Sequence, residues 1–140
     1  HIPSGLMLPF EGHTTFSETL RSQVSATEPL TKQLWQQTVK SKIFNQAKSL
    51  EYAGENSNAL KELLKEVKSG DTTNTEGRAA NIYWRKFFGN DSDFKRRRFG
   101  SPPNHLLNYG YAILRSVIAR SIVGSGLLPA LGIHLSLIHI

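Results

Sequence analysis

The sequence predicts an all-α protein, and three observations lead to this prediction. Apolar residues recur at helical spacing through most of the chain, as Phe16, Leu20 and Val24 do near its start. Glycine, proline and asparagine separate these stretches, at the places where helices would begin and end. No segment alternates apolar and polar residues as a half-buried strand does. With 140 residues and 39% hydrophobic content, the chain is expected to form one compact domain.

The first half of the chain predicts an irregular lead-in followed by three helices. Residues 1–14 hold two prolines and two glycines, which prevent a regular element. Apolar spacing then predicts helices over residues 15–26, 28–53 and 57–68. Pro29 falls in the first turn of the second helix, where proline is tolerated because the N–H that it lacks would have no helical partner.

A fourth helix is predicted over residues 74–88, with Asn74 as its N-cap, and it places an acid on its apolar face. Glu76, Ala80, Tyr83 and Phe87 fall at i, i+4, i+7 and i+11. One interpretation is structural, because an acid in the first turn is stabilised by the helix dipole by about 0.3–1 kcal/mol. The other is that Glu76 serves a metal or a reaction, since a covered carboxylate needs a partner. The residues of this segment leave both interpretations open.

The loop expected over residues 91–102 contains the most basic run of the chain. Four consecutive cations at 95–98 stand between two phenylalanines, a composition that suits phosphate binding with the rings stacking or anchoring the loop. Arg96, Arg97 and Arg98 are therefore candidate DNA contacts. A solvated loop without a partner is the alternative.

Charge is distributed unevenly along the chain. Residues 1–84 hold nine Lys and Arg against nine Asp and Glu, whereas residues 85–140 hold eight against two. The whole formal charge of +6 therefore belongs to the second segment. This asymmetry favours a polyanionic partner, although a basic composition also occurs in proteins that bind no nucleic acid.

The most apolar helix is predicted over residues 104–123, and we expect it to be central and buried. A short apolar run, residues 127–134, follows it and ends in His134. In such surroundings a histidine is commonly a hydrogen-bonded structural residue. Together with Glu76, it would provide a nitrogen and an oxygen ligand suited to Mn²⁺ or Mg²⁺. Sequence spacing does not place the two side by side.

Composition and motifs exclude several kinds of site. The chain has no cysteine, so it forms neither a disulfide nor a thiolate metal site. There is no glycine-rich phosphate loop and no serine in a nucleophile elbow. Residues 121–140 lack charged side chains, but glycines and Pro129 interrupt them, so we predict no membrane span. No signal peptide is visible, and the start resembles the interior of a longer protein.

Five stretches of the sequence occur in the same order in a known family. They are PSGLMLPFEGH at 3–13, LWQQTVK with KIFNQA at 34–47, EGRAA with YW at 76–84, NHLLNYGYAIL at 104–114, and GLLPALGIH at 126–134. Through them the chain resembles the helical C-terminal region of the CRISPR-associated integrases called Cas one, most closely their type II form. The resemblance extends over residues 1–134.

The resemblance implies a metal-dependent DNA endonuclease and integrase of the prokaryotic cytoplasm. Such an enzyme inserts spacer DNA into CRISPR arrays by attack of a 3′-hydroxyl on a phosphodiester, in defence against viruses. It implies Mn²⁺ or Mg²⁺ as cofactor, with Glu76 and His134 matching two of the family's catalytic metal ligands. Implied partners are double-stranded DNA (spacer precursor and CRISPR repeat), a second copy in a homodimer, and the small protein Cas two. The rival hypothesis is a non-catalytic basic helical module that binds nucleic acid or a protein.

Two departures from the family pattern qualify these expectations. Residues 135–140, LSLIHI, do not fit the pattern, which continues there toward a third, acidic metal ligand. His139 is accordingly not expected to be a ligand. The family also places a β-rich domain before the segment that begins at His1. We therefore expect residues 15–134 to be an incomplete helical catalytic domain, and this chain by itself to be inactive.

Overall fold

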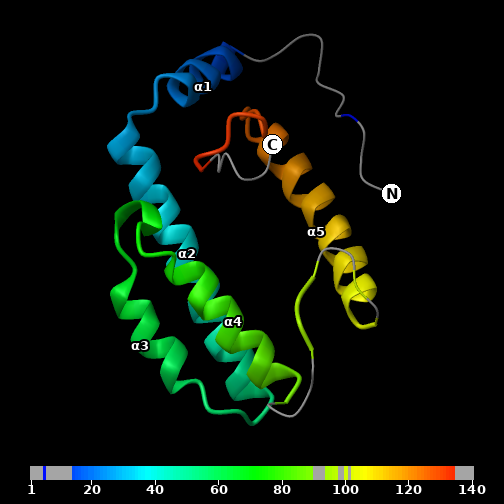
Figure 1. Cartoon of the computed structure of the whole chain (residues 1–140). Coiled ribbons are helices and arrows are strands. Elements are labelled where there is room, and N and C mark those ends of the chain that lie inside the picture. The colour runs from blue at the N-terminus through cyan, green and yellow to red at the C-terminus, as the bar shows by residue number, and fades with distance from the viewer. Residues whose placement is uncertain (1–4, 6–13, 90–93, 98–99, 101, 135–140) are drawn as a thin grey trace. The chain divides into compact units, whose positions relative to one another are not determined.

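The computed structural model describes Gly5 and residues 14–89, 94–97, 100 and 102–134. These residues form five α-helices and one short 3-10 helix, with no strand among them, which confirms the all-α prediction (Figure 1). The elements are α1 (Thr14–Val24), α2 (Glu28–Tyr52), α3 (Asn58–Glu66), η1 (Ser69–Asp71), α4 (Thr75–Phe87) and α5 (Asn104–Gly124). Each predicted helix is present, with ends within two residues of the prediction.

The predicted boundaries of the catalytic domain stay predictions. The lead-in, residues 1–14, lies outside the described residues except for Gly5 and Thr14, and so does the tail at 135–140. Between these ends the chain separates into two compact units, where the sequence predicts one. The α1–α5 unit contains α1 and α5, and the α2–α4 unit spans Thr27–Arg96 with α2, α3, η1 and α4. The two units are described separately.

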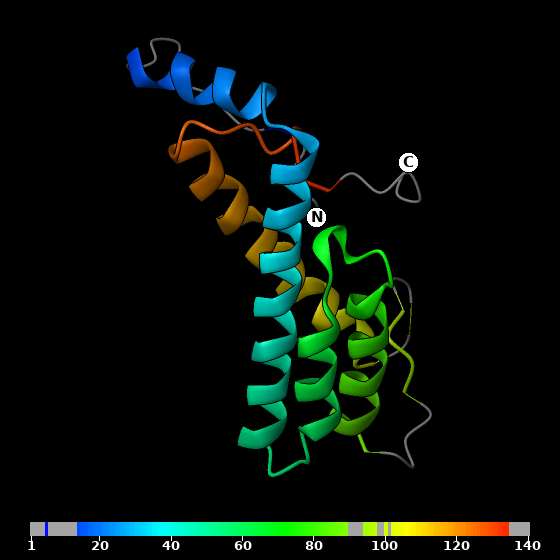
Figure 2. The same cartoon turned by 90° about the vertical axis from the view of Figure 1, so that its left-hand side faces the viewer.

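The α2–α4 unit is a bundle of three helices around an apolar core. Its helices α2, α3 and α4 lie side by side (Figure 1, Figure 2). Every buried hydrophobic residue of the described chain lies in this unit: Val39, Ile43, Ala47, Leu50, Leu60, Leu63, Val67 and Ala79. The four from α2 follow helical spacing, as the sequence predicts. Each large side chain buried in this way contributes about 1.5–3 kcal/mol relative to exposure, so the core sets the positions of the three helices.

The helix expected over residues 104–123 is confirmed as α5, but the prediction that it is buried is wrong. Only Asn104 of α5 is buried, and Leu106, Tyr109 and Leu114 are more than half exposed. The other helix described in its unit, α1, has eleven residues, most of them polar. Helix α1 does not pack along α5, so the apolar side chains of α5 stay exposed among the described residues. None of the described helices combines the length and apolar content that a bilayer span requires.

Candidate metal site

Helix α4 begins in a tightly bonded polar turn. The carboxylate of Asp71 accepts hydrogen bonds from the backbone N–H groups of Thr75, at 2.8 Å, and Glu76, at 3.0 Å. Asn74 is the N-cap, as the sequence predicts, and its side-chain oxygen accepts from the N–H of Gly77 at 3.3 Å. Three successive N–H groups at the start of α4 are thus satisfied by side chains. The backbone that carries Glu76 is fixed by these bonds.

The conformation of this turn explains why its residues are Asp, Asn and Gly. Asp71 and Asn74 adopt left-handed backbone angles, with φ of 48° and 50°, which Asp and Asn tolerate better than most residues. A Cβ atom at Gly77 would lie 2.8 Å from the side-chain amide of Asn74. A side chain at position 77 would therefore require the capping amide of Asn74 to shift.

Glu76 lies on the flank of α4 that faces α2, beside the core and not within it. The fully buried positions of α4 are Thr75 and Ala79, one residue before the predicted apolar face in each turn. The prediction that Glu76 shares a face with Phe87 in the core is therefore wrong in detail, since Phe87 is exposed. The side chain of Glu76 is 29% exposed. Partial exposure leaves it accessible to a solvated ion.

A lysine from α2 provides the partner of this carboxylate. Lys42 Nζ donates a hydrogen bond to Glu76 Oε1 and forms an ion pair with it. Within the described residues, the other carboxylate oxygen of Glu76 accepts no hydrogen bond. One cation already lies against one oxygen of this acid, and the second oxygen is left for another ligand.

The contact between Lys42 and Glu76 belongs to a longer row of polar side chains between α2 and α4. Farther along the same helices, Ser49 Oγ and Tyr83 Oη lie 3.3 Å apart. Gln46 falls between Lys42 and Ser49 on the same face of α2, and its buried Oε1 has no hydrogen-bond partner among the described residues. These five residues are called the α2–α4 polar row.

The carboxylate of Glu76 is the kind of donor that a hard divalent cation prefers. Mg²⁺ and Mn²⁺ prefer carboxylate and carbonyl oxygens, and the row contains the Glu76 carboxylate and the buried amide oxygen of Gln46. The ammonium group of Lys42 also demonstrates that a cation is accommodated at this carboxylate. No group of three or more His, Cys, Asp and Glu that could hold a metal occurs in the described part of the chain.

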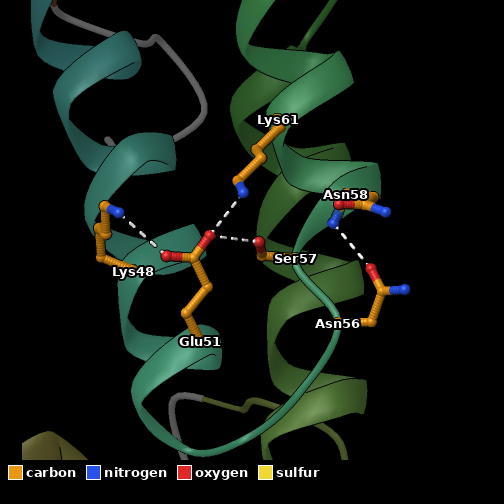
Figure 3. A network of polar contacts seen from close by, with 6 residues as sticks. All are labelled: Lys48, Glu51, Asn56, Ser57, Asn58 and Lys61. Atoms are coloured by element: carbon orange, nitrogen blue, oxygen red, sulfur yellow. Dashed lines mark hydrogen bonds and ion pairs between the residues drawn. The ribbon is translucent and has the colours of Figure 1, made fainter.

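Glu51, another acid of the α2–α4 unit, has a different environment (Figure 3). Its Oε1 accepts from Lys61, at 2.6 Å, and from Ser57, at 2.8 Å, and its Oε2 accepts from Lys48 at 3.0 Å. Hydrogen bonds from Lys61, then Lys48 and Ser57, lower the pKa of the Glu51 carboxyl from its ordinary 4.5 to about 2. Both oxygens of Glu51 are occupied, so this network ties the end of α2 to the start of α3.

His134 belongs to the α1–α5 unit, where it is exposed and is the last described residue. The segment before it is bonded to α1 through Gln23. The side-chain amide of Gln23 donates to the carbonyls of Leu128, at 2.9 Å, and Leu131, at 3.0 Å, and accepts from the N–H of Leu128 at 2.9 Å. Since Glu76 and His134 lie in separate units, their sharing of one ion stays a prediction.

The basic run begins at an anchored phenylalanine. The ring of Phe94 lies 4.1 Å from that of Phe88 and 6.0 Å from that of Trp84, measured between centroids. The prediction that an aromatic residue anchors the loop is thus confirmed for Phe94. Of the candidate DNA contacts, Arg96 is half-buried and Arg97 is exposed, while Arg98 lies outside the described residues.

Sequence analysis missed four residues that support these sites: Asp71, Lys42, Gln46 and Gln23. Asp71 lies in the turn before α4, five residues before Glu76, and this spacing is the available signal that it bonds to the start of the helix. Lys42 and Gln46 are polar residues at i and i+4 beside the apolar stripe of α2, which is a weak signal for a common face. Gln23 acts on residues 105 and 108 positions away, and nothing local identifies it.

Comparison with known proteins first identifies the class to which this chain belongs, the CRISPR-associated proteins. The family model described as "CRISPR associated protein Cas1" matches residues 3–135, which include both Glu76 and His134. The chain is 40% identical, over 134 residues, to "CRISPR-associated endonuclease Cas1" of Neisseria meningitidis serogroup C (strain 8013), covering 94% of this chain and 43% of that protein. The chain belongs to the Cas1 family.

A second relative agrees with this assignment. The chain is 36% identical, over 113 residues, to "CRISPR-associated endonuclease Cas1 1" of Francisella tularensis subsp. novicida (strain U112), with 67% of this chain and 36% of that protein covered. The chain therefore spans less than half the length of these curated relatives.

Proposed function

We propose that this chain forms part of the catalytic region of a metal-dependent DNA endonuclease and integrase that inserts spacer DNA into CRISPR arrays. Membership of the Cas1 family supports the proposal, as do the names of two relatives as CRISPR-associated endonucleases. The observation that carries it is the position of Glu76. This acid stands on a helix start fixed by Asp71 and Asn74, and a cation already lies against one of its oxygens.

Glu76 and His134 are the proposed metal ligands. A bound Mn²⁺ or Mg²⁺ would supply electrostatic stabilisation of the scissile phosphate and of the leaving oxygen. The chain's own residues orient the ligands. Asp71 holds the backbone N–H of Glu76, and Gln23 holds the segment that leads to His134. Preorganisation of this kind reduces the cost of bringing a substrate into position.

The proposed substrates are double-stranded DNA molecules, namely a spacer precursor and a CRISPR repeat. Eight basic against two acidic residues over positions 85–140 favour a polyanionic partner. Arg96, Arg97 and Arg98 would contact phosphates, which position DNA without reading its sequence. A second copy of the chain and Cas two are the proposed protein partners, and the prokaryotic cytoplasm is the proposed location.

A titration with Mn²⁺ tests the metal proposal on this chain. The electron paramagnetic resonance signal of free Mn²⁺ falls when the ion binds, which gives its affinity directly. Glu76→Gln and His134→Ala are each expected to weaken Mn²⁺ binding at least about tenfold. Removal of a residue that merely supports a metal ligand already costs about this much, so removal of a ligand should cost no less. Glu55→Gln removes an exposed acid without an ion pair among the described residues and is the control. Unchanged affinity in Glu76→Gln would refute the assignment.

A chimaera tests the activity. Residues 3–134 of this chain replace the matching segment of the Neisseria meningitidis relative, and Mn²⁺-dependent cleavage of a labelled DNA duplex is measured. Cleavage is expected to persist in the chimaera and in its Glu55→Gln form, and to be lost with Glu76→Gln. Cleavage that survives Glu76→Gln would favour the rival function, a basic helical module that binds DNA without a catalytic role.

A further inference from the structure

Lys42 differs from the other lysines of the α2–α4 unit because, among the described residues, it is the only side chain bonded to the carboxylate of Glu76, a proposed metal ligand. Lys42 and Glu76 come from different helices, and their side chains are 46% and 29% exposed. An ion pair with this exposure shifts an equilibrium by only about 1.4- to 5-fold. Such a pair is weak enough to be exchanged for a divalent ion.

We propose that Lys42 is an exchangeable cation that alternates between Glu76 and a DNA phosphate. It bonds to the carboxylate when no divalent ion is present, and it turns to the DNA backbone once that carboxylate holds a divalent ion. The proposal rests on the proposed function, because it takes Glu76 as a metal ligand. It adds a substrate contact to the site and couples DNA binding to metal binding.

The position of Lys42 suits this exchange. Ile43 directly follows Lys42, and Val39 lies one helical turn before it. Both are fully buried in the core, so the backbone of α2 is fixed at this point. The lysine side chain beyond it has four flexible methylene groups and ends in a compact charge with three N–H donors. A fixed base and a flexible, half-exposed end allow Nζ to move between two anions while the helix stays in place.

Gln46, one helical turn along α2 from Lys42, provides a second observation. Its buried Oε1 has no hydrogen-bond donor among the described residues, and the residue lies one turn after Lys42 on the same face of α2. Buried acceptors without a donor are uncommon, since each costs free energy. A polar ligand in this row would supply the missing donor or cation. This face of α2 therefore leaves one buried acceptor open to a further polar occupant.

Comparison with the Glu51 network shows how the Lys42–Glu76 pair differs from an ordinary ion pair between helices. Glu51 has donors on both oxygens, from two lysines and a serine, and leaves no oxygen for an ion. Glu76 has one lysine on one oxygen. The first network is closed and structural, whereas the second is open on one side.

Two measurements on this chain test the exchange. Lys42→Met keeps most of the stem and removes the charge, so Mn²⁺ should bind about 1.4- to 5-fold more tightly once the competing cation is gone. Lys40→Met is the matched control, because Lys40 is an exposed lysine of α2 without an ion pair in the described residues. Its Mn²⁺ affinity should stay unchanged. Equal or weaker Mn²⁺ binding in Lys42→Met overturns the proposal.

The second measurement is the salt dependence of binding to a short DNA duplex. With Mn²⁺ present, Lys42→Met should reduce the slope of log K against log salt by about 0.9, the change expected when a single phosphate is no longer neutralised. Without Mn²⁺ the slope should not change, because Lys42 is then held by Glu76. A slope that changes equally with and without Mn²⁺ overturns the exchange.

Glu76→Gln separates failure of this proposal from failure of the proposed function. If Glu76→Gln keeps normal Mn²⁺ affinity, the metal assignment fails and the exchange fails with it. If Mn²⁺ binding is lost, the metal assignment stands, and Lys42 is released without metal. The DNA salt slope of Glu76→Gln should then rise by about 0.9 in Mn²⁺-free buffer and return to the starting value in Lys42→Met/Glu76→Gln. Glu55→Gln controls for the change in net charge. If its DNA salt slope rises as much as that of Glu76→Gln, net charge explains the rise, and the role proposed for Lys42 is overturned.

Discussion

The two proposed metal ligands stand on backbone that is held in different ways. Glu76 follows a turn in which Asp71 and Asn74, both within five residues of it, bond to three N–H groups of α4. The segment before His134 is held by Gln23, a side chain more than a hundred positions away in the sequence.

The backbone at Glu76 is thus positioned by short-range hydrogen bonds, and the segment before His134 by long-range ones. A local turn fixes a ligand as soon as its helix forms, because all the bonds are short-range. A bond from a distant residue forms only after the chain has folded, and it opens when that contact opens. Glu76 is therefore expected to be the more firmly placed of the two. The following predictions test this comparison, from the largest expected effect to the smallest.

Removal of the Asp71 carboxylate should have the largest effect. Asp71→Ala leaves two N–H groups at the start of α4 without acceptors, and the free energy of unfolding should fall by about 2 kcal/mol. Both tryptophans of the chain, Trp35 and Trp84, lie in the α2–α4 unit, so their fluorescence during urea unfolding measures this unit. Asp71→Asn keeps one acceptor and should lose about half as much. Wild-type stability in Asp71→Ala would show that the turn does not hold Glu76.

Removal of the Gln23 amide should have a smaller, local effect. In Gln23→Ala the segment loses three hydrogen bonds that are partly exposed, and water replaces part of their contribution. The free energy of local opening at Leu128 should fall by about 1 kcal/mol, which makes exchange of its amide hydrogen about fivefold faster. Gln23→Glu keeps an acceptor for the N–H of Leu128 and should show an intermediate rate. The comparison fails if exchange at Leu128 is as slow in Gln23→Ala as in the wild type.

Glu51 supplies the smallest effect, and it is limited to acid pH. Because hydrogen bonds from Lys61, Lys48 and Ser57 lower the pKa of this carboxyl to about 2, its stabilisation is complete above about pH 4.5. The unfolded chain binds a proton first as the pH falls, so the contribution should be lost between about pH 4.5 and 2. Glu51→Gln should flatten the decline of stability in this window. The same variant should bind Mn²⁺ like the wild type, which would separate the closed network from the open one. An unaltered acid profile would show that the Glu51 network does not form in solution.

Much of the fold follows from local pattern. All five helices were predicted within two residues of their ends, because apolar spacing and end signals such as Asn74 and Pro29 act over a few residues. The cap at Asn74 and the first-turn position of Glu76 were predicted for the same reason. The family resemblance rests on motifs that are also readable without a structure, and the family match over residues 3–135 confirms it.

Tertiary structure alone decided the rest. The composition of α5 predicts burial, yet exposure depends on what lies against a helix, and α1, the other described helix of its unit, does not pack along it. Likewise, Lys42 is an ordinary lysine in the sequence until the packing of α2 against α4 brings its ammonium group to Glu76. Gln23 holds Leu128 only because folding places them together. Sequence pattern determines structure over the few residues of a helical turn, whereas these contacts join residues 34 to 108 positions apart, where only the packing of the helices sets the distance.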